Sequence, residues 1–242
     1  MNELANELKL WLLAVGVCLP RLVAVFTFLP FFADKAIPML LRAGVAVVLS
    51  SVMVPATMVA LQTQQFALYE LALLLAKEVF IGILIGFLVA IVFWVLSAVG
   101  FFIDTQRGSM NTDLFNPVAG GAATPLGTFF SQLGVTVLFS TGGFLLLMDG
   151  IYNSYVAWPI LSYMPLFDWA SMDYFLSQLD FLMHMMLLLS APIVLIMFIA
   201  EFAMALIGRF VPQINIFILA MPIKSAVGFF LLVLYIGYLI HY

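Results

Sequence analysis

Residues 79–103 form an apolar run of 25 residues without a charged side chain. A helix needs roughly 20 such residues to cross the hydrocarbon core of a bilayer. The whole chain is similar, because its 242 residues include only 8 Lys or Arg and 12 Asp or Glu. A soluble domain carries about 25% charged residues. The sequence therefore predicts an integral membrane protein, and its net charge of −4 excludes nucleic acid as a partner.

Charged residues and prolines divide the chain into about six apolar blocks, each of which we expect to cross the membrane. Backbone amides in lipid need partners within their own structure, and the chain lacks the alternating pattern of a transmembrane barrel. The predicted fold class is therefore all-α. The blocks are residues 10–33, 43–61, 79–103, 127–148, 181–207 and 210–240.

Most of these blocks contain a proline or a charge, whereas residues 79–103 and 127–148 are clean. A proline inside a helix removes a backbone hydrogen bond, and a charge at membrane depth is costly unless it faces protein or water. We therefore predict that several helices are broken and pack against other protein. The interrupting residues are Pro20, Arg21, Pro55, Pro192, Glu201, Pro212, Pro222 and Lys224.

Small residues recur at four-residue spacing in the third block. Gly82, Gly86 and Ala90 would lie on one face of a helix, where a second helix could approach closely. Apolar runs also produce this pattern by chance, so both interpretations stay open at this point.

The basic residues are unevenly distributed. None lies between Arg107 and Arg209, and residues 149–180 hold four aspartates and six of the twelve Trp and Tyr residues. This composition is typical of a non-cytoplasmic interfacial loop. With six spans, the connections near Arg107 and Arg209 face the cytoplasm and both termini face outward, although Lys9 and Lys77 oppose this orientation.

The sequence lacks the usual catalytic patterns. His184 and His241 are the only histidines and lie 57 residues apart, and no HExxH, GxSxG or nucleotide-binding motif occurs. Asp104 and Asp113 could pair as acid and base, but we favour hydrated loop carboxylates or partners of Arg107. We expect no enzymatic activity, no metal and no cofactor.

Several stretches resemble, in order, the type III secretion export-apparatus family SctT/FliR. Each motif alone is weak, but the ordered combination covers essentially the whole chain. The matching stretches are Leu19-Pro20-Arg21-Leu22, Phe28-Leu29-Pro30-Phe31-Phe32, Ile37-Pro38, Leu41-Arg42, the run from Gly100 to Pro117, Gly208-Arg209-Phe210-Val211-Pro212-Gln213-Ile214-Asn215-Ile216-Phe217, and Met221-Pro222-Ile223-Lys224.

The resemblance implies a non-enzymatic subunit of the gate that passes unfolded proteins across the bacterial inner membrane. In that family one copy joins several copies of SctR/FliP and SctS/FliQ, with SctU/FlhB nearby, in an assembly raised toward the periplasm. It implies one export-gate domain over residues 1–242, with residues 1–175 SctR/FliP-like and residues 176–242 a SctS/FliQ-like hairpin. The system is an injectisome or a flagellum, and the TQRGSMN stretch favours the injectisome.

The central loop, about residues 104–126, is polar and rich in glycine between two apolar runs. In the family this loop enters the pore and helps to plug it, whereas an ordinary cytoplasmic turn is the alternative. The expected plug residues are Gln106, Arg107, Gly108, Ser109, Met110, Asn111, Phe115, Asn116, Pro117, Gly120 and Gly121. Expected subunit contacts, or residues at the cytoplasmic mouth, are Arg21, Arg209, Pro212, Gln213, Pro222 and Lys224.

An independent secondary transporter of a small solute is the alternative function. Such a carrier usually contains inverted repeats and ionisable residues near the midplane of the membrane. The sequence shows no convincing internal repeat, and Glu201 and Lys224 are the only candidate deep charges in its second half. A subunit of a larger assembly is therefore the favoured interpretation.

Overall fold

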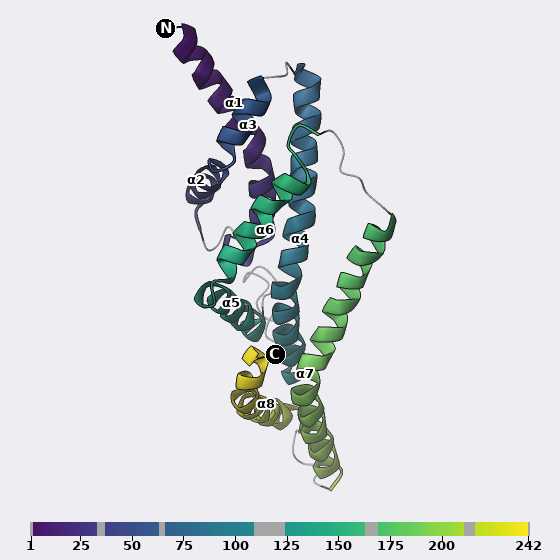
Figure 1. Ribbon diagram of the computed structural model, residues 1–242. Coiled ribbons are helices and arrows are strands. Elements are labelled where there is room, and N and C mark those ends of the chain that lie inside the picture. Colours follow the sequence, from purple (N-terminus) through teal and green to yellow (C-terminus); the bar gives the residue numbers. More distant parts are fainter. Residues whose placement is uncertain are drawn as a thin grey trace. The chain divides into compact units, whose positions relative to one another are not determined.

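The computed structural model describes residues 2–32, 37–62, 66–108, 124–162, 169–210 and 216–241. Within these ranges every regular element is helical, which confirms the all-α prediction (Figure 1). The elements are α1 (Asn2–Phe28), the short 3-10 helix η1 (Pro30–Phe32), α2 (Met39–Ser50), α3 (Val54–Gln62), α4 (Leu68–Arg107), α5 (Pro125–Ser140), α6 (Gly143–Ala157), α7 (Trp169–Phe210) and α8 (Ile216–His241).

Four described helices are long and apolar enough to cross a membrane. They are α1 from Asn6 to Phe28, α4, α7 from Asp173 to Phe210 and α8 from Leu219 to Gly237. Two helix pairs, α2 with α3 and α5 with α6, are bent by 64° and 79°, and the number of spans rises to six if each bent pair counts as one. The prediction of about six apolar spans with broken helices is thus confirmed.

The bends do not lie at most of the prolines that the sequence singled out. α1 continues through Pro20, α7 through Pro192 and α8 through Pro222, so the expected breaks there are wrong. A proline removes one backbone hydrogen bond, and the packing of the surrounding helix outweighs that loss. Only the bend between α2 and α3 lies beside a proline, Pro55, in the first turn of α3.

The second bend interrupts residues 127–148, which were expected to form an unbroken span. α5 ends at Ser140 and α6 begins at Gly143, with Gly142 between them at a φ of +76°. Only glycine adopts this left-handed conformation at little cost, so the chain turns where Gly142 permits it.

Residues 149–180 were expected to be a loop and are largely helical instead. α6 extends to Ala157 and α7 begins at Trp169. Ile151 and Tyr155 are buried at helical spacing, and the hydroxyl of Tyr155 donates a hydrogen bond to the backbone oxygen of Cys18 at 2.8 Å. Tyr155 of α6 therefore packs inside unit 1, and the position of residues 149–180 at the membrane surface stays a prediction.

Residue contacts divide the chain into two compact units. Unit 1 contains Met1–Phe93 and Val135–Gln178, and unit 2 contains Trp94–Gly134 and Leu179–Tyr242. The proposed division of the chain at residue 175 into SctR/FliP-like and SctS/FliQ-like parts stays a prediction.

Unit 1 is built around α1. This helix packs against both α2 and α3, and Leu22, Val25 and Phe26 on it are fully buried. The ring of Phe26 stacks on that of Phe32 in η1, with 4.1 Å between their centroids. Burial of these side chains supplies the apolar contacts that position the polar groups of α1 described below.

Gly82 and Gly86 on α4 lie at a close contact with α1, which is one of the two interpretations of their spacing given above. A Cβ atom added to Gly82 would clash with the backbone oxygen of Arg21 and lie 2.7 Å from the Cβ of Ala24. One added to Gly86 would lie 3.0 Å from the Cα of Val25. The backbone of α1 therefore occupies the space that side chains on this face of α4 would need.

We expect the substitution Gly82→Leu to destabilise unit 1 by about 1–3 kcal/mol, because α1 must move away from α4 to admit the side chain. Thermal unfolding of the purified protein in detergent measures the change. Gly16→Leu is the matched control, since a Cβ at Gly16 meets no atom within 4 Å. Equal unfolding midpoints for the two variants would contradict this account of the packing.

Candidate functional site

The central loop begins later than the sequence indicated. α4 continues to Arg107, so Gln106 and Arg107 lie in its last turn and not in the loop. Gly108 ends the helix with a φ of +83°, and its N–H donates to the oxygen of Thr105 at 3.0 Å. The other predicted plug residues lie outside the described residues: Ser109, Met110, Asn111, Phe115, Asn116, Pro117, Gly120 and Gly121.

The far end of the loop is fixed by the start of α5. Pro125 is the first helical residue, where its missing N–H costs nothing. The hydroxyl of Thr124 accepts a hydrogen bond from the N–H of Gly127 at 3.2 Å, as a helix-capping residue does. Thr124 is buried, so this cap is part of the packed structure.

Asp104 joins the two ends of the loop. One oxygen of its fully buried carboxylate pairs with the guanidinium of Arg107, three residues along α4. Its other oxygen, Oδ2, accepts a hydrogen bond from the N–H of Leu126 in the first turn of α5 at 2.7 Å. A carboxylate at a helix N-terminus also interacts favourably with the helix dipole. We call Asp104, Arg107, Thr124 and Leu126 the stem cluster.

Two glycines allow the helices to meet at the stem cluster. A Cβ atom on Gly100 would overlap the backbone of Leu126 and Gly127, and one on Gly127 would lie 3.0 Å from the oxygen of Ser97. The backbones of α4 and α5 are therefore in direct contact, which brings Asp104 within reach of the N–H of Leu126.

Arg107 extends the stem cluster to α8. Its guanidinium carbon lies 4.5 Å from the centre of the Phe229 ring, in cation–π geometry. Gly228, next to Phe229 on α8, lets α8 approach α7 closely, since a Cβ atom on Gly228 would lie 2.8 Å from the sulfur of Met197 on α7. The Nε atom of Arg107 is buried and has no hydrogen-bond partner among the described residues.

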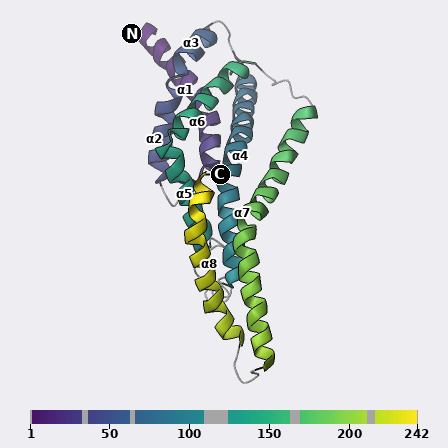
Figure 2. The same cartoon turned by 60° about the horizontal axis from the view of Figure 1, so that its bottom comes forward.

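Glu201 on α7 lies close to the same turn of α4. Its Oε2 atom pairs with the ammonium of Lys224 on α8 at 2.8 Å and accepts a hydrogen bond from the amide of Gln106 at 3.4 Å. The Lys224 side chain is 11% exposed, whereas that of Glu201 is 46% exposed. α7 and α8 run side by side here as a hairpin (Figure 2). Glu201 and Lys224, the two candidate deep charges of the sequence analysis, therefore form an ion pair with each other.

A second polar cluster, in unit 1, is centred on Arg21. Its guanidinium makes a two-point contact with the carboxylate of Glu78 on α4, at 2.7 and 3.0 Å. It also donates to the hydroxyl of Ser154 and to the backbone oxygen of Trp158, both at 2.9 Å, and lies 4.0 Å from the ring centre of Tyr155. Arg21 and Glu78 are fully buried, so α1, α4 and the end of α6 meet at this ion pair.

Lys77 completes the Arg21 cluster. Its ammonium pairs with Glu78 at 2.9 Å and donates to the backbone oxygens of Pro159, Ile160 and Ser162 at 2.9, 2.6 and 2.9 Å. The sequence reading used Lys77 only as evidence on orientation and missed Glu78. Two adjacent charges inside an otherwise apolar helix were the signal that could have revealed the site.

The other predicted contact residues are scattered. Arg209 is exposed in the last turn of α7, and Pro222 lies inside α8. Pro212 and Gln213 lie outside the described residues. Arg21 has its ionic partner within the chain, and the roles of all six residues as subunit contacts or parts of the mouth stay predictions.

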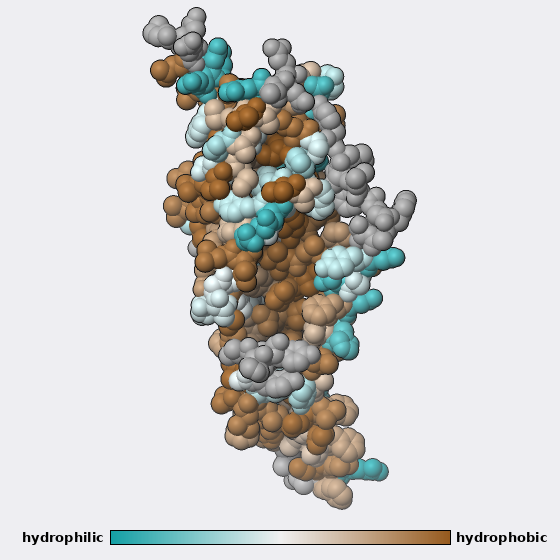
Figure 3. All heavy atoms as spheres, in the orientation of Figure 1, coloured by the Kyte–Doolittle hydropathy of each residue, from teal (hydrophilic) through white to brown (hydrophobic). Residues whose placement is uncertain are grey.

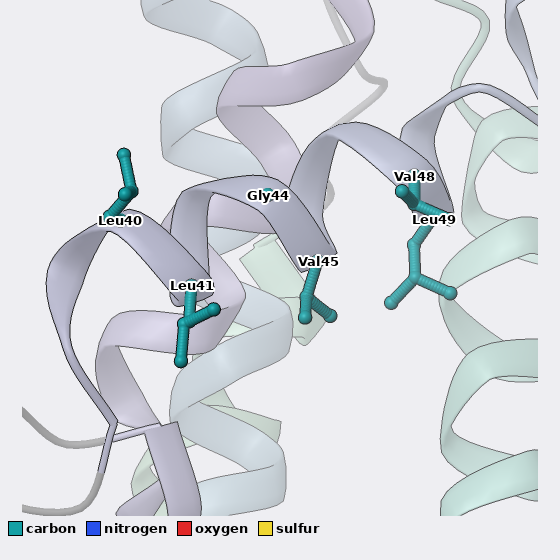
Figure 4. Close-up of a pocket in the computed structure, with 6 residues that line it drawn as sticks. All are labelled: Leu40, Leu41, Gly44, Val45, Val48 and Leu49. Carbon is teal, nitrogen blue, oxygen red and sulfur yellow. The ribbon is translucent and has the colours of Figure 1, made fainter.

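The described surface has an apolar hollow on α2. Hydrophobic side chains gather over α2 (Figure 3), and Leu41, Val45 and Leu49 point to the same side of the helix (Figure 4). The hollow has no polar side chain to recognise a polar solute; its lining residues are Leu40, Leu41, Gly44, Val45, Val48 and Leu49.

Among the described residues, no three His, Cys, Asp or Glu side chains gather as a metal ion would require.

We expect Arg21→Met to destabilise the protein by about 3–5 kcal/mol, because a buried carboxylate then loses its main partner. Arg21→Lys should recover only part of the loss, since an ammonium cannot make the two-point contact. Chemical unfolding in detergent measures both. Arg209→Met, at an exposed arginine, is the control and should change stability by less than about 0.5 kcal/mol. Equal effects at the two positions would refute a structural role for the Arg21 cluster.

The stem cluster makes a separate prediction. Asp104→Asn removes the negative charge of the carboxylate that accepts hydrogen bonds from the guanidinium of Arg107 and the N–H of Leu126. A hydrogen bond to a charged group contributes about 1.5–3 kcal/mol to stability. Amide hydrogen exchange at the start of α5 should therefore become about ten- to hundredfold faster, as mass spectrometry of peptides from this helix can measure. Asp149→Asn, on the exposed face of α6, should leave that exchange rate unchanged.

Comparison with known proteins identifies the family. The family model described as "Bacterial export proteins, family 1" matches residues 12–242. The chain is 39% identical over 234 residues to "Yop proteins translocation protein T" of Yersinia pestis, covering 96% of this chain and 89% of the relative. It is 28% identical over 250 residues to "Secretion system apparatus protein SsaT" of Salmonella typhimurium, covering 99% and 93%.

A flagellar relative is also similar. "Flagellar biosynthetic protein FliR" of Bacillus subtilis is 27% identical over 215 residues, which cover 88% of this chain and 82% of the relative. These matches confirm the resemblance to SctT/FliR that the ordered motifs indicated. The chain belongs to the bacterial export proteins, family 1.

Proposed function

We propose that this protein is a core subunit of a type III secretion export gate that passes unfolded proteins across the bacterial inner membrane. The observation that carries the proposal is the family match over residues 12–242, together with relatives named for translocation, secretion apparatus and flagellar biosynthesis. The names of these relatives favour export over an independent solute carrier and over an enzyme. Identity of 39% to the Yop translocation protein, against 27% to FliR, favours an injectisome.

The length of α7 supports assembly with other subunits. Within unit 2 this helix extends from Leu179 to Phe210, about 48 Å at 1.5 Å per residue. A hydrocarbon core about 30 Å thick covers only about 39 Å of a helix, even at a 40° tilt. Exposed apolar side chains occur along the whole stretch, including Leu179, Met183, Leu195, Phe202 and Phe210.

Part of this apolar face therefore extends beyond the hydrocarbon core. Exposed apolar surface of this extent is typical of an interface with another protein. We infer that neighbouring SctR/FliP-like and SctS/FliQ-like subunits cover it, with an SctU/FlhB-like subunit nearby. This assembly would stand raised toward the periplasm, with Arg209, Pro212, Gln213, Pro222 and Lys224 close to the cytoplasmic mouth or to other subunits.

We further propose that the central loop plugs the pore. The stem cluster supports this role, because Asp104 fastens α4 to α5 immediately outside residues 109–123. A segment whose two ends are held together at its base can change position without disrupting the helices on either side. Glycines and short polar side chains suit a loop that meets both water and a passing polypeptide.

Deletion of residues 108–121 tests the plug. We expect the complex still to co-purify with its two smaller partner subunits, because the deletion spares the stem cluster, while the membrane becomes leaky to small ions. Conductance of cells or of reconstituted vesicles measures the leak. An assembled complex with unchanged conductance would refute the plug. A chain that transported a small solute alone in liposomes would instead favour the carrier.

A further inference from the structure

The hollow on α2 lies between two rows of side chains of that helix. Its six lining residues form the rows Leu40–Gly44–Val48 and Leu41–Val45–Leu49, each with a spacing of four residues (Figure 4). Rows at this spacing are the ridges of a helix surface, and the groove between two ridges receives a ridge of another helix when helices pack. The hollow therefore has the shape that a helix offers to a second helix.

The protein covers only one side of α2. Ala46 and Ser50 are buried and Arg42 and Leu49 are half-buried on the side where α2 packs against α1 and its neighbours. The other eight residues of α2, which the structure describes in full, are exposed, and none of them has a polar side chain: Met39, Leu40, Leu41, Ala43, Gly44, Val45, Val47 and Val48. A helix that lies on a membrane surface turns a polar face to water. The exposed side of α2 is therefore suited to contact with protein or with hydrocarbon.

Gly44 distinguishes a protein contact from a lipid contact. A glycine inside a helix weakens that helix relative to alanine. Gly82 and Gly86 admit the backbone of α1, whereas a Cβ atom on Gly44 would meet no atom within 4 Å. The described residues thus make no use of the space over Gly44. Fluid acyl chains adapt to any apolar side chain and do not need a glycine, but a packed membrane helix approaches closely where a residue is small.

We propose that the hollow on α2 is the docking site for an apolar helix of another subunit of the export gate. A large aliphatic or aromatic side chain of that helix lies over Gly44, between the rows of Leu40 and Leu41. A symmetric pair of α2 helices does not meet this need, because the same groove would face itself and the space over both glycines would stay unfilled. The proposal rests on the assembly of subunits proposed above.

The substitution Gly44→Leu tests the docking site by filling it. The unfolding temperature of the isolated protein in detergent should stay the same or rise, because the new side chain meets no atom of the described chain and leucine favours a helix. In membranes that contain all gate subunits, recovery of the other membrane subunits with this protein should fall about tenfold or more, since the leucine occupies the space of the partner side chain.

Gly150→Leu on α6 is the matched control. A Cβ atom on Gly150 also meets no atom within 4 Å, but its neighbours Asp149 and Asn153 form an exposed hydrogen bond with each other, so this surface is polar. The variant should recover the other subunits as the parent protein does. A Gly44→Leu variant that unfolds at a clearly lower temperature would overturn the proposal, because the space over Gly44 would then belong to the fold of the chain itself.

Photo-crosslinking identifies what lies over the hollow. A benzoylphenylalanine in place of Leu40, which is 84% exposed at the rim, should cross-link to another gate subunit in the assembled complex. The yield should fall about tenfold when Gly44→Leu is added, for the reason given above. Cross-links to lipid alone, or to a second copy of this chain, would overturn the proposal.

The parent protein separates failure of this inference from failure of the proposed function. If the parent protein assembles and Gly44→Leu assembles equally well, the gate function stands and the docking site is refuted. If the parent protein recovers no other membrane subunit, the proposed function is refuted and the docking site falls with it.

Discussion

The buried ion pair between Arg21 and Glu78 is the interaction on which unit 1 depends. Two charges removed from water are tolerated only when they are paired and their remaining hydrogen-bonding groups are satisfied. Here the guanidinium also binds Ser154 and the oxygen of Trp158, and Lys77 shares the carboxylate. Because these groups come from α1, α4 and α6, the pair fixes which faces of the three helices meet. The glycine face of α4 allows the approach, and the ion pair determines its position.

Unit 2 uses the same chemistry a second time. α4 contributes a second buried carboxylate, Asp104, which pairs with Arg107, and this arginine also lies over an aromatic ring, Phe229. In unit 1 the corresponding ring is Tyr155 over Arg21. In each cluster the guanidinium pairs with a carboxylate at its edge and lies against a ring with its face, so both kinds of contact help to offset the loss of water. Both polar clusters therefore hold helices together. The stem cluster is also of functional interest because it lies at the base of the central loop.

Exposed apolar side chains occur along the 32 residues of α7 in unit 2, which suits the assembly of subunits that we propose. Within such an assembly a gate needs one element that moves and others that stay fixed. Asp104 joins the last turn of α4 to the first turn of α5, and Glu201 on α7 pairs with Lys224 on α8 and accepts a hydrogen bond from Gln106.

The sequence by itself determined the membrane environment, the all-α fold and, through its ordered motifs, the family, because hydropathy and local motifs are properties of neighbouring residues. It did not determine where helices bend, that residues 149–180 are mostly helical, or that α4 includes Gln106 and Arg107. Only the tertiary structure decided that Arg21 pairs with Glu78, 57 positions away, and that Gln106 meets Glu201, 95 positions away. Apolar runs look alike to any local pattern, and these two contacts form only when helices distant in sequence have packed, unlike the local pair of Asp104 and Arg107.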